Sequence, residues 1–110
     1  MENRFDRTEM LIGKESLSSL SKAKVLIFGI GGVGGYVTEA LARSGVGSMV
    51  LVDNDTVSVT NINRQIIATD STVGMYKAEV MKTRILDINP EAQVEVRNCF
   101  YLPENAEEFD

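Results

Sequence analysis

Two clusters of residues in this sequence could bind a phosphorylated ligand. The first, Gly29-Ile-Gly-Gly-Val-Gly34, matches the pattern G-x-G-x-x-G. Glycines at these positions permit a tight turn and let backbone N–H groups approach phosphates, and the following helix adds positive potential. Asp53 ends the next apolar run and is placed to accept hydrogen bonds from ribose hydroxyls. We therefore predict a nucleotide site contacted by Gly29, Gly31, Gly32, Gly34 and Asp53. The alternatives are a glycine turn needed only for helix–sheet packing and a carboxylate that caps a loop.

The second cluster is Asn61-Ile-Asn63-Arg64-Gln65, in the polar loop predicted over residues 56–72. It gathers amide and guanidinium groups beside the predicted nucleotide. The triphosphate of ATP needs such partners, whereas a hydride-transfer domain has no evident need for them. The apolar Ile66 and Ile67 indicate that the segment docks onto the domain, although a solvated loop with asparagine turns is the alternative.

Lys77 is predicted to lie near the start of a helix over residues 74–89, where the helix dipole disfavours a cation. A lysine that reaches β- and γ-phosphates would have a reason to be there, and a surface lysine is the alternative. We expect Lys82 and Arg84, further along this helix, to face solvent. Asp55 is either a second polar contact of the site or a turn former.

The elements that must position these residues alternate between strand and helix. A short apolar run is typical of a strand buried on both faces, and amphipathic stretches follow each such run. We predict an α/β fold with a Rossmann-like βαβαβ unit, half of a doubly wound, mainly parallel sheet with strand order 3-2-1. An amino-terminal helical segment precedes this unit. The predicted helices cover residues 2–22 (broken at Gly13), 36–44, 74–89 and the start of another at 103–110, and the strands cover 24–30, 49–52 and the region of Val94 and Val96.

Length and composition limit the function classes. The 110 residues suffice for one small domain, residues 1–110, with residues 1–22 as a helical extension; a doubly wound fold needs a second half, so we expect a truncated domain. The net charge of −5 disfavours autonomous binding of nucleic acid. With no histidine and a single cysteine, Cys99, we predict neither a metal site nor a disulfide, and expect a cytoplasmic protein. No apolar run is long enough for a membrane span.

Several motifs resemble one family. GIGGVG, LVDNDTVSVTNINRQI, VGMYKAEV and INP together are similar to the ThiF/MoeB/HesA superfamily, the bacterial relatives of ubiquitin-activating enzymes. The Arg-Phe-Asp-Arg start and the Thr-Asn-Ile-Asn-Arg-Gln segment look most like the tRNA threonylcarbamoyladenosine dehydratase branch. The molybdopterin and thiamine branches more typically carry Ser-Asn-Leu-Gln-Arg-Gln.

This resemblance implies that ATP with Mg²⁺ transfers AMP to a carboxylate and that pyrophosphate is released. It implies that the glycines line the phosphates, that Asp53 holds the ribose, and that Asn61, Arg64 and Lys77 contact the triphosphate. Arg7 matches an arginine that the family's homodimers insert into the partner's site. The acceptor would be a modified adenosine of tRNA, or a sulfur-carrier protein in the alternative branch. An NAD-dependent oxidoreductase, or a nucleotide-binding module that is inactive by itself, remains open.

Overall fold

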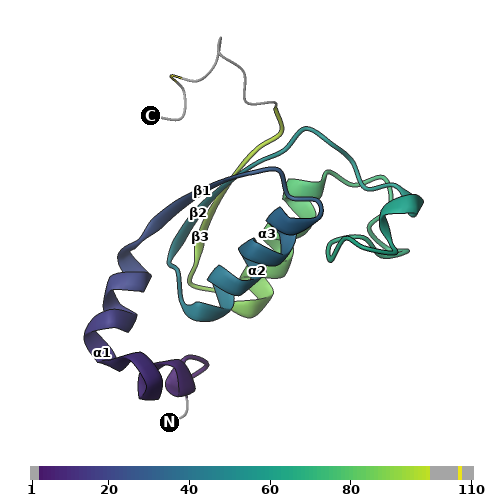
Figure 1. The fold of residues 1–110 in the computed structure, drawn as a ribbon. Coiled ribbons are helices and arrows are strands. Elements are labelled where there is room, and N and C mark those ends of the chain that lie inside the picture. Colours follow the sequence, from purple (N-terminus) through teal and green to yellow (C-terminus); the bar gives the residue numbers. More distant parts are fainter. Residues whose placement is uncertain (1–2, 100–106, 108–110) are drawn as a thin grey trace.

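Three parallel strands form the centre of the structure, a computed structural model that describes residues 3–99 and Glu107. They are β1 (Lys24–Phe28), β2 (Ser48–Val52) and β3 (Gln93–Arg97), in the order β1-β2-β3 (Figure 1). Lys24 pairs with Ser48, which pairs with Gln93, and this register continues along all five residues of each strand. The predicted strand order is therefore confirmed.

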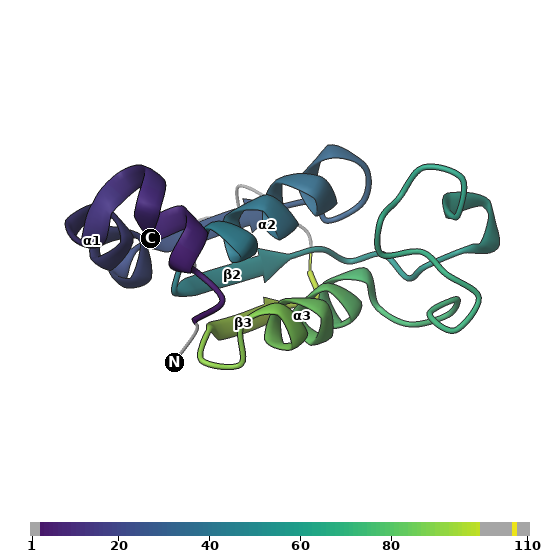
Figure 2. The ribbon, with the colours of Figure 1, turned by 90° about the horizontal axis from the view of Figure 1, so that it is seen from below.

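Helices α2 (Val33–Ser44) and α3 (Lys77–Ile88) lie side by side on one face of this sheet (Figures 1 and 2). Alternate strand residues point toward them, as the pleat requires. Packing of the two helices on this face removes apolar side chains from water, which is the main force that holds the layers together. The core includes Ile27, Met49, Leu51, Ala42, Met81 and Ile85.

Helix α1 (Asp6–Lys22) lies at the amino ends of the strands (Figure 1). It is kinked at Gly13, where φ is 87°, as the sequence predicted. None of its 17 residues, all of them described, is buried, although Leu20 packs against the core. Arg4 precedes α1 and donates a hydrogen bond of 2.7 Å to the carbonyl oxygen of Ile88, so the amino-terminal segment is tied to the end of α3.

Three predicted helix starts were wrong. Helix α1 begins at Asp6 rather than residue 2, and residues 3–5 are not helical. The other two starts were wrong by three residues. Helix α2 begins at Val33 rather than residue 36, so its amino terminus lies directly on the glycine turn. Helix α3 begins at Lys77 rather than Gly74, because the residues before it pair with the chain that follows β2. Gly74 donates to Val57 and Val57 to Met75, both at 2.8 Å, and Thr56 bridges to Tyr76. The helix predicted over 103–110 lies, apart from Glu107, outside the described residues.

Arg84 was predicted to face solvent, but its half-exposed side chain forms an ion pair with another helix. Its side chain donates a hydrogen bond to Glu39 of α2, and Arg43 lies 3.3 Å from the other oxygen of Glu39. The Arg84 hydrogen bond lowers the pKa of the Glu39 carboxyl below its usual value, against the opposing effect of burial. This ion pair joins the two helices. No described helix is long and apolar enough to cross a membrane.

Candidate functional site

The glycine-rich turn joins β1 to α2 at the carboxyl edge of the sheet (Figure 1). Gly29 continues the sheet pairing by donating to the carbonyl oxygen of Val52 at 2.9 Å. A β-carbon on Gly34 would collide with the carbonyl oxygen of Gly29, so the close approach of helix and strand requires glycine there. Gly32 caps α2. The backbone N–H groups that begin α2 therefore lie at the edge where ligands of such sheets bind.

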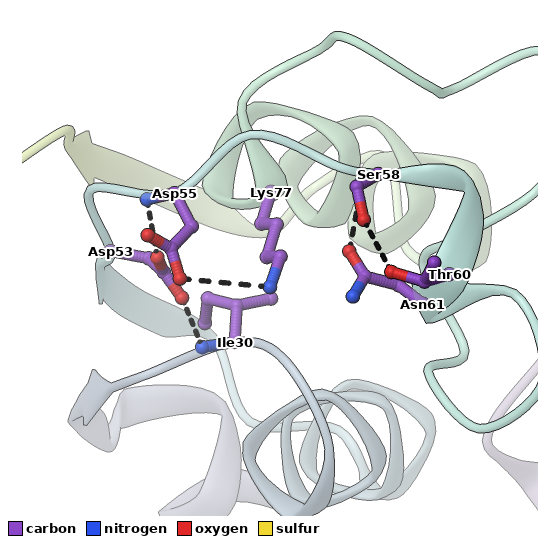
Figure 3. Close-up of polar contacts among 7 residues, drawn as sticks. All are labelled: Ile30, Asp53, Asp55, Ser58, Thr60, Asn61 and Lys77. Carbon is purple, nitrogen blue, oxygen red and sulfur yellow. Dashed lines mark hydrogen bonds and ion pairs between the residues drawn. The ribbon is translucent and has the colours of Figure 1, made fainter.

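Asp53 links this turn to the chain that follows β2 (Figure 3). Its Oδ2 accepts a hydrogen bond of 2.7 Å from the N–H of Ile30, and its Oδ1 accepts one of 2.8 Å from the N–H of Asp55. Each carboxylate oxygen has a further lone pair. Asp53 can therefore fix the two loops relative to each other and still accept a ribose hydroxyl.

A cavity of about 210 Å³ opens beside Asp53. Larger cavities, of about 540 Å³ near α1 and about 640 Å³ between residues 66–75 and α3, lie elsewhere. The smaller one is the candidate nucleotide site, because ligands of open α/β sheets bind outside the carboxyl ends of the strands. Its lining residues are Phe28, Gly29, Val52, Asp53, Asn54, Asp55 and Cys99.

Lys77 is the first residue of α3, and only 8% of its side chain is exposed. Its N–H donates to the carbonyl oxygen of Asp55 at 3.0 Å, and its Nζ lies 3.7 Å from Asp55 Oδ2. The surface-lysine alternative is therefore wrong: Lys77 is a buried cation beside the glycine turn and Asp53 (Figure 3).

Asn61 ends the short 3₁₀ helix η1 (Val59–Asn61) and is buried. Its Oδ1 accepts a hydrogen bond of 2.9 Å from the N–H of Ser58, so its oxygen stabilises the loop and its NH₂ group is the part that can donate to a ligand. Asn63 and Arg64 are exposed. Arg64 Nη1 donates to the carbonyl oxygen of Thr60 at 3.0 Å and to Asn63 Oδ1 at 3.1 Å, which holds the guanidinium against its own loop.

Gln65 and Ile66 dock this loop onto the glycine turn. A β-carbon on Gly31 would lie 2.8 Å from Gln65 Oε1, and one on Gly35 would lie 3.1 Å from Ile66 Cγ2. Gln65 Oε1 is buried without a hydrogen-bond partner among the described residues. The docking predicted from the apolar residues after Arg64 is thus observed. The solvated-loop alternative is wrong for Asn61 and Gln65, whereas Asn63 and Arg64 are exposed.

The structure gathers the glycine turn, Asp53, Asp55, Gln65 and Lys77 at one edge of the sheet. It does not bring Arg7 to them, because α1 lies at the opposite end of the strands (Figure 1). Sequence reasoning missed the N–H of Ile30 and the half-buried Cys99. The signal for Cys99 was its position just after the third strand, whose end was not predicted. Within residues 3–99 and Glu107, no three acidic, cysteine or histidine side chains are grouped to hold a metal ion.

Comparison with known proteins shows which family this chain resembles. The model of the ThiF family matches residues 5–109. The chain is 51% identical over 109 residues to the tRNA threonylcarbamoyladenosine dehydratase of Bacillus subtilis, covering 99% of this chain and 43% of that protein. It is 41% identical over 93 residues to the molybdopterin-synthase adenylyltransferase of Salmonella typhimurium, covering 83% of this chain and 37% of that protein.

Solved structures agree with the sequence comparison. The tRNA N6-threonylcarbamoyladenosine dehydratase of E. coli, solved in complex with ATP and in complex with AMP, is 47% identical to this chain. The TM-scores are 0.94 and 0.95, and each alignment covers 96% of this chain and 44% of that chain. The α/β fold predicted from the sequence is confirmed. The chain spans less than half the length of these relatives.

Proposed function

Since this chain belongs to the ThiF family, we propose that the whole protein uses ATP to adenylylate a carboxylate. One observation carries the proposal: a buried lysine, a half-buried aspartate and a glycine turn meet at the carboxyl edge of the sheet. This edge combines a ribose acceptor, phosphate-facing backbone donors and a cation. Such a combination suits a nucleoside triphosphate.

The residues fit ATP in two further respects. Close contacts at Gly31 and Gly34 leave little room for a β-carbon. Without β-carbons, the backbone N–H groups of the turn are accessible to phosphates. The buried Oε1 of Gln65, which lacks a hydrogen-bond partner among the described residues, lies against Gly31. A phosphate oxygen there would accept a hydrogen bond from the NH₂ group of Gln65 once the amide rotates by half a turn.

Bound ATP supplies an electrophilic α-phosphorus and a pyrophosphate leaving group. We assign the glycines 29, 31, 32 and 34 to the phosphates and Asp53 to the ribose. The NH₂ of Asn61 and the cations of Arg64 and Lys77 stabilise negative charge on the phosphates, with Asn63 and Gln65 holding Arg64 and the turn in place. This chemistry needs positioning and charge stabilisation more than proton transfer, which suits a site without histidine.

Three further parts of the proposal come from the sequence analysis, and among them Mg²⁺ and the homodimer are implied by the family resemblance. Mg²⁺ accompanies ATP, with its protein ligand outside the described residues. The protein is a cytoplasmic homodimer in which Arg7 enters the partner's site, in keeping with its distance from this chain's own glycine turn. The domain spans residues 1–110 with residues 1–22 as an extension.

We propose a tRNA carrying threonylcarbamoyladenosine as the acceptor. The higher identity to the dehydratase of Bacillus subtilis than to the molybdopterin-synthase adenylyltransferase supports this choice, 51% against 41%. A sulfur-carrier protein with a carboxyl-terminal carboxylate is the second candidate, because the 41% identity makes that branch a relative too.

The test has two steps with the whole protein. Calorimetry compares ATP with NAD, and binding of NAD but not ATP would refute the proposal. Pyrophosphate release is then measured with the modified tRNA, with unmodified tRNA and with a sulfur-carrier protein. Release that depends on the modified tRNA supports the dehydratase function, whereas release with the carrier protein alone would assign the second candidate.

A further inference from the structure

Lys77 is the only charged residue with a buried side chain among those that the structure describes. Removing an ammonium from water is costly unless an opposite charge or hydrogen bonds compensate. Its place as the first residue of α3 adds a small penalty, because the amino-terminal end of a helix carries positive potential. Something nearby must therefore hold this cation in place.

Asp55 contacts both the backbone N–H and the side-chain ammonium of Lys77. Its carbonyl oxygen accepts the backbone N–H of Lys77 at 3.0 Å, which fixes where α3 begins. Its carboxylate Oδ2 lies 3.7 Å from the ammonium nitrogen. Figure 3 shows the long side chain of Lys77 extending from the helix toward this carboxylate. One residue thus sets both the origin and the far end of the lysine side chain.

Asp55 is itself held by Asp53, whose Oδ1 accepts its N–H at 2.8 Å. Asp53 in turn accepts the N–H of Ile30 in the glycine turn. The contacts therefore run from the glycine turn through the two aspartates to Lys77. Replacing the Asp55 side chain would leave every backbone contact in this series in place, so its carboxylate can be tested alone.

We propose that Asp55 is a positioning residue: its carboxylate holds the Lys77 ammonium where it meets the phosphates of ATP, and Asp55 does not bind the nucleotide itself. A carboxylate is a poor phosphate ligand because like charges repel, and the ribose acceptor at this edge is Asp53. The inference rests on the proposed use of ATP and deepens it.

The positioning role predicts whether ATP affinity rises or falls when Asp55 is replaced by asparagine. If Asp55 were merely a nearby negative charge, its neutral variant Asp55→Asn would bind ATP more tightly, because a repulsion would be lost. If it positions Lys77, Asp55→Asn binds ATP more weakly, by about tenfold. Adenosine, which has no phosphates, binds both proteins equally. Loss of local structure would instead weaken both ligands.

The experiment measures ATP and adenosine binding to the whole protein by calorimetry for the unchanged protein, Asp55→Asn, Lys77→Met and the double variant. In the Lys77→Met background, Asp55→Asn should change ATP affinity less than twofold, since no lysine is left to position. Asp55→Glu, which retains the charge, should recover part of the affinity. Asp70→Asn removes one exposed charge from the same loop and serves as the matched control.

Each outcome decides the point. ATP binding by Asp55→Asn that is unchanged or tighter would overturn the inference, and so would an equal tenfold loss in the Lys77→Met background, which would mark a direct contact. Equal loss of adenosine and ATP binding would overturn it as well. If the unchanged protein bound no ATP, the proposed function itself would fail, which the first titration reveals separately.

Discussion

A β-carbon on Gly31 would lie 2.8 Å from Oε1 of Gln65, the far end of a flexible side chain. At Gly34 the obstacle is the backbone carbonyl of Gly29, which cannot move without disturbing the end of β1. The same substitution should therefore have different consequences three residues apart.

We expect Gly34→Ala to destabilise the protein by about 3 kcal/mol, even though alanine is normally the better helix residue. Gly31→Ala should cost about 1 kcal/mol or less and should weaken ATP binding by displacing Gln65. Urea unfolding of the two variants of the whole protein measures the first effect, and calorimetry the second. Equal destabilisation by both variants would show that the Gln65 side chain is as immovable as the backbone.

Removal of either cation of the site should slow AMP transfer. We expect Arg64→Ala or Lys77→Ala to cost on the order of 3 kcal/mol in the transition state, about a hundredfold in rate. The hydrogen bonds that Arg64 donates to Thr60 and Asn63 are exposed, so water can replace them. The loss of Arg64 should therefore slow the reaction without unfolding the loop. Pyrophosphate release under saturating ATP measures the effect, and a loss under threefold at both positions would remove them from the mechanism.

The fold could be predicted from the sequence because its signals are local. Continuous apolar runs marked β1 and β2, and Gly13 marked the kink of α1, where φ is 87°. Helix starts were less accurate because they depend on tertiary contacts. Because residues 56–57 pair with residues 74–76 through their backbones, α3 begins only at Lys77. No residue type in that segment predicts this pairing.

The site residues were predicted by type, and their mutual contacts were not. Helical spacing shows which residues share a face but not what that face meets, so the contact of Arg84 with Glu39, 45 residues away, was missed. The link between Asp55 and Lys77 joins residues 22 positions apart through a loop with no regular period. Such pairings depend on how the loop folds back, which a single sequence does not encode locally.

Asp53 should have two separable effects. Asp53→Ala removes the acceptor of a possible ribose contact, so ATP should weaken by about tenfold while inorganic triphosphate weakens much less. The variant also frees the N–H groups of Ile30 and Asp55, so the free energy of unfolding should fall by about 2 kcal/mol. Calorimetry with both ligands separates the effects. Equal weakening of ATP and triphosphate would mean that Asp53 acts through the structure of the loop alone.

Stability at acid pH should depend on Glu39. The Arg84 hydrogen bond lowers the pKa of the Glu39 carboxyl below its usual value of 4.5, against the opposing effect of burial. A carboxyl with a lower pKa in the folded state stabilises the protein above its unfolded pKa, and this contribution is lost as the pH falls through the folded pKa.

Glu39→Gln should therefore lower the free energy of unfolding by about 1 kcal/mol at neutral pH, a modest effect because the Arg84 side chain is 40% exposed. The difference from the unchanged protein should shrink steadily as the pH drops below 4.5. Urea unfolding between neutral and acid pH measures it, with Glu15→Gln on the exposed surface of α1 as the control. A difference that stays constant across this range would mean that Glu39 stabilises the contact between α2 and α3 by packing rather than by its charge.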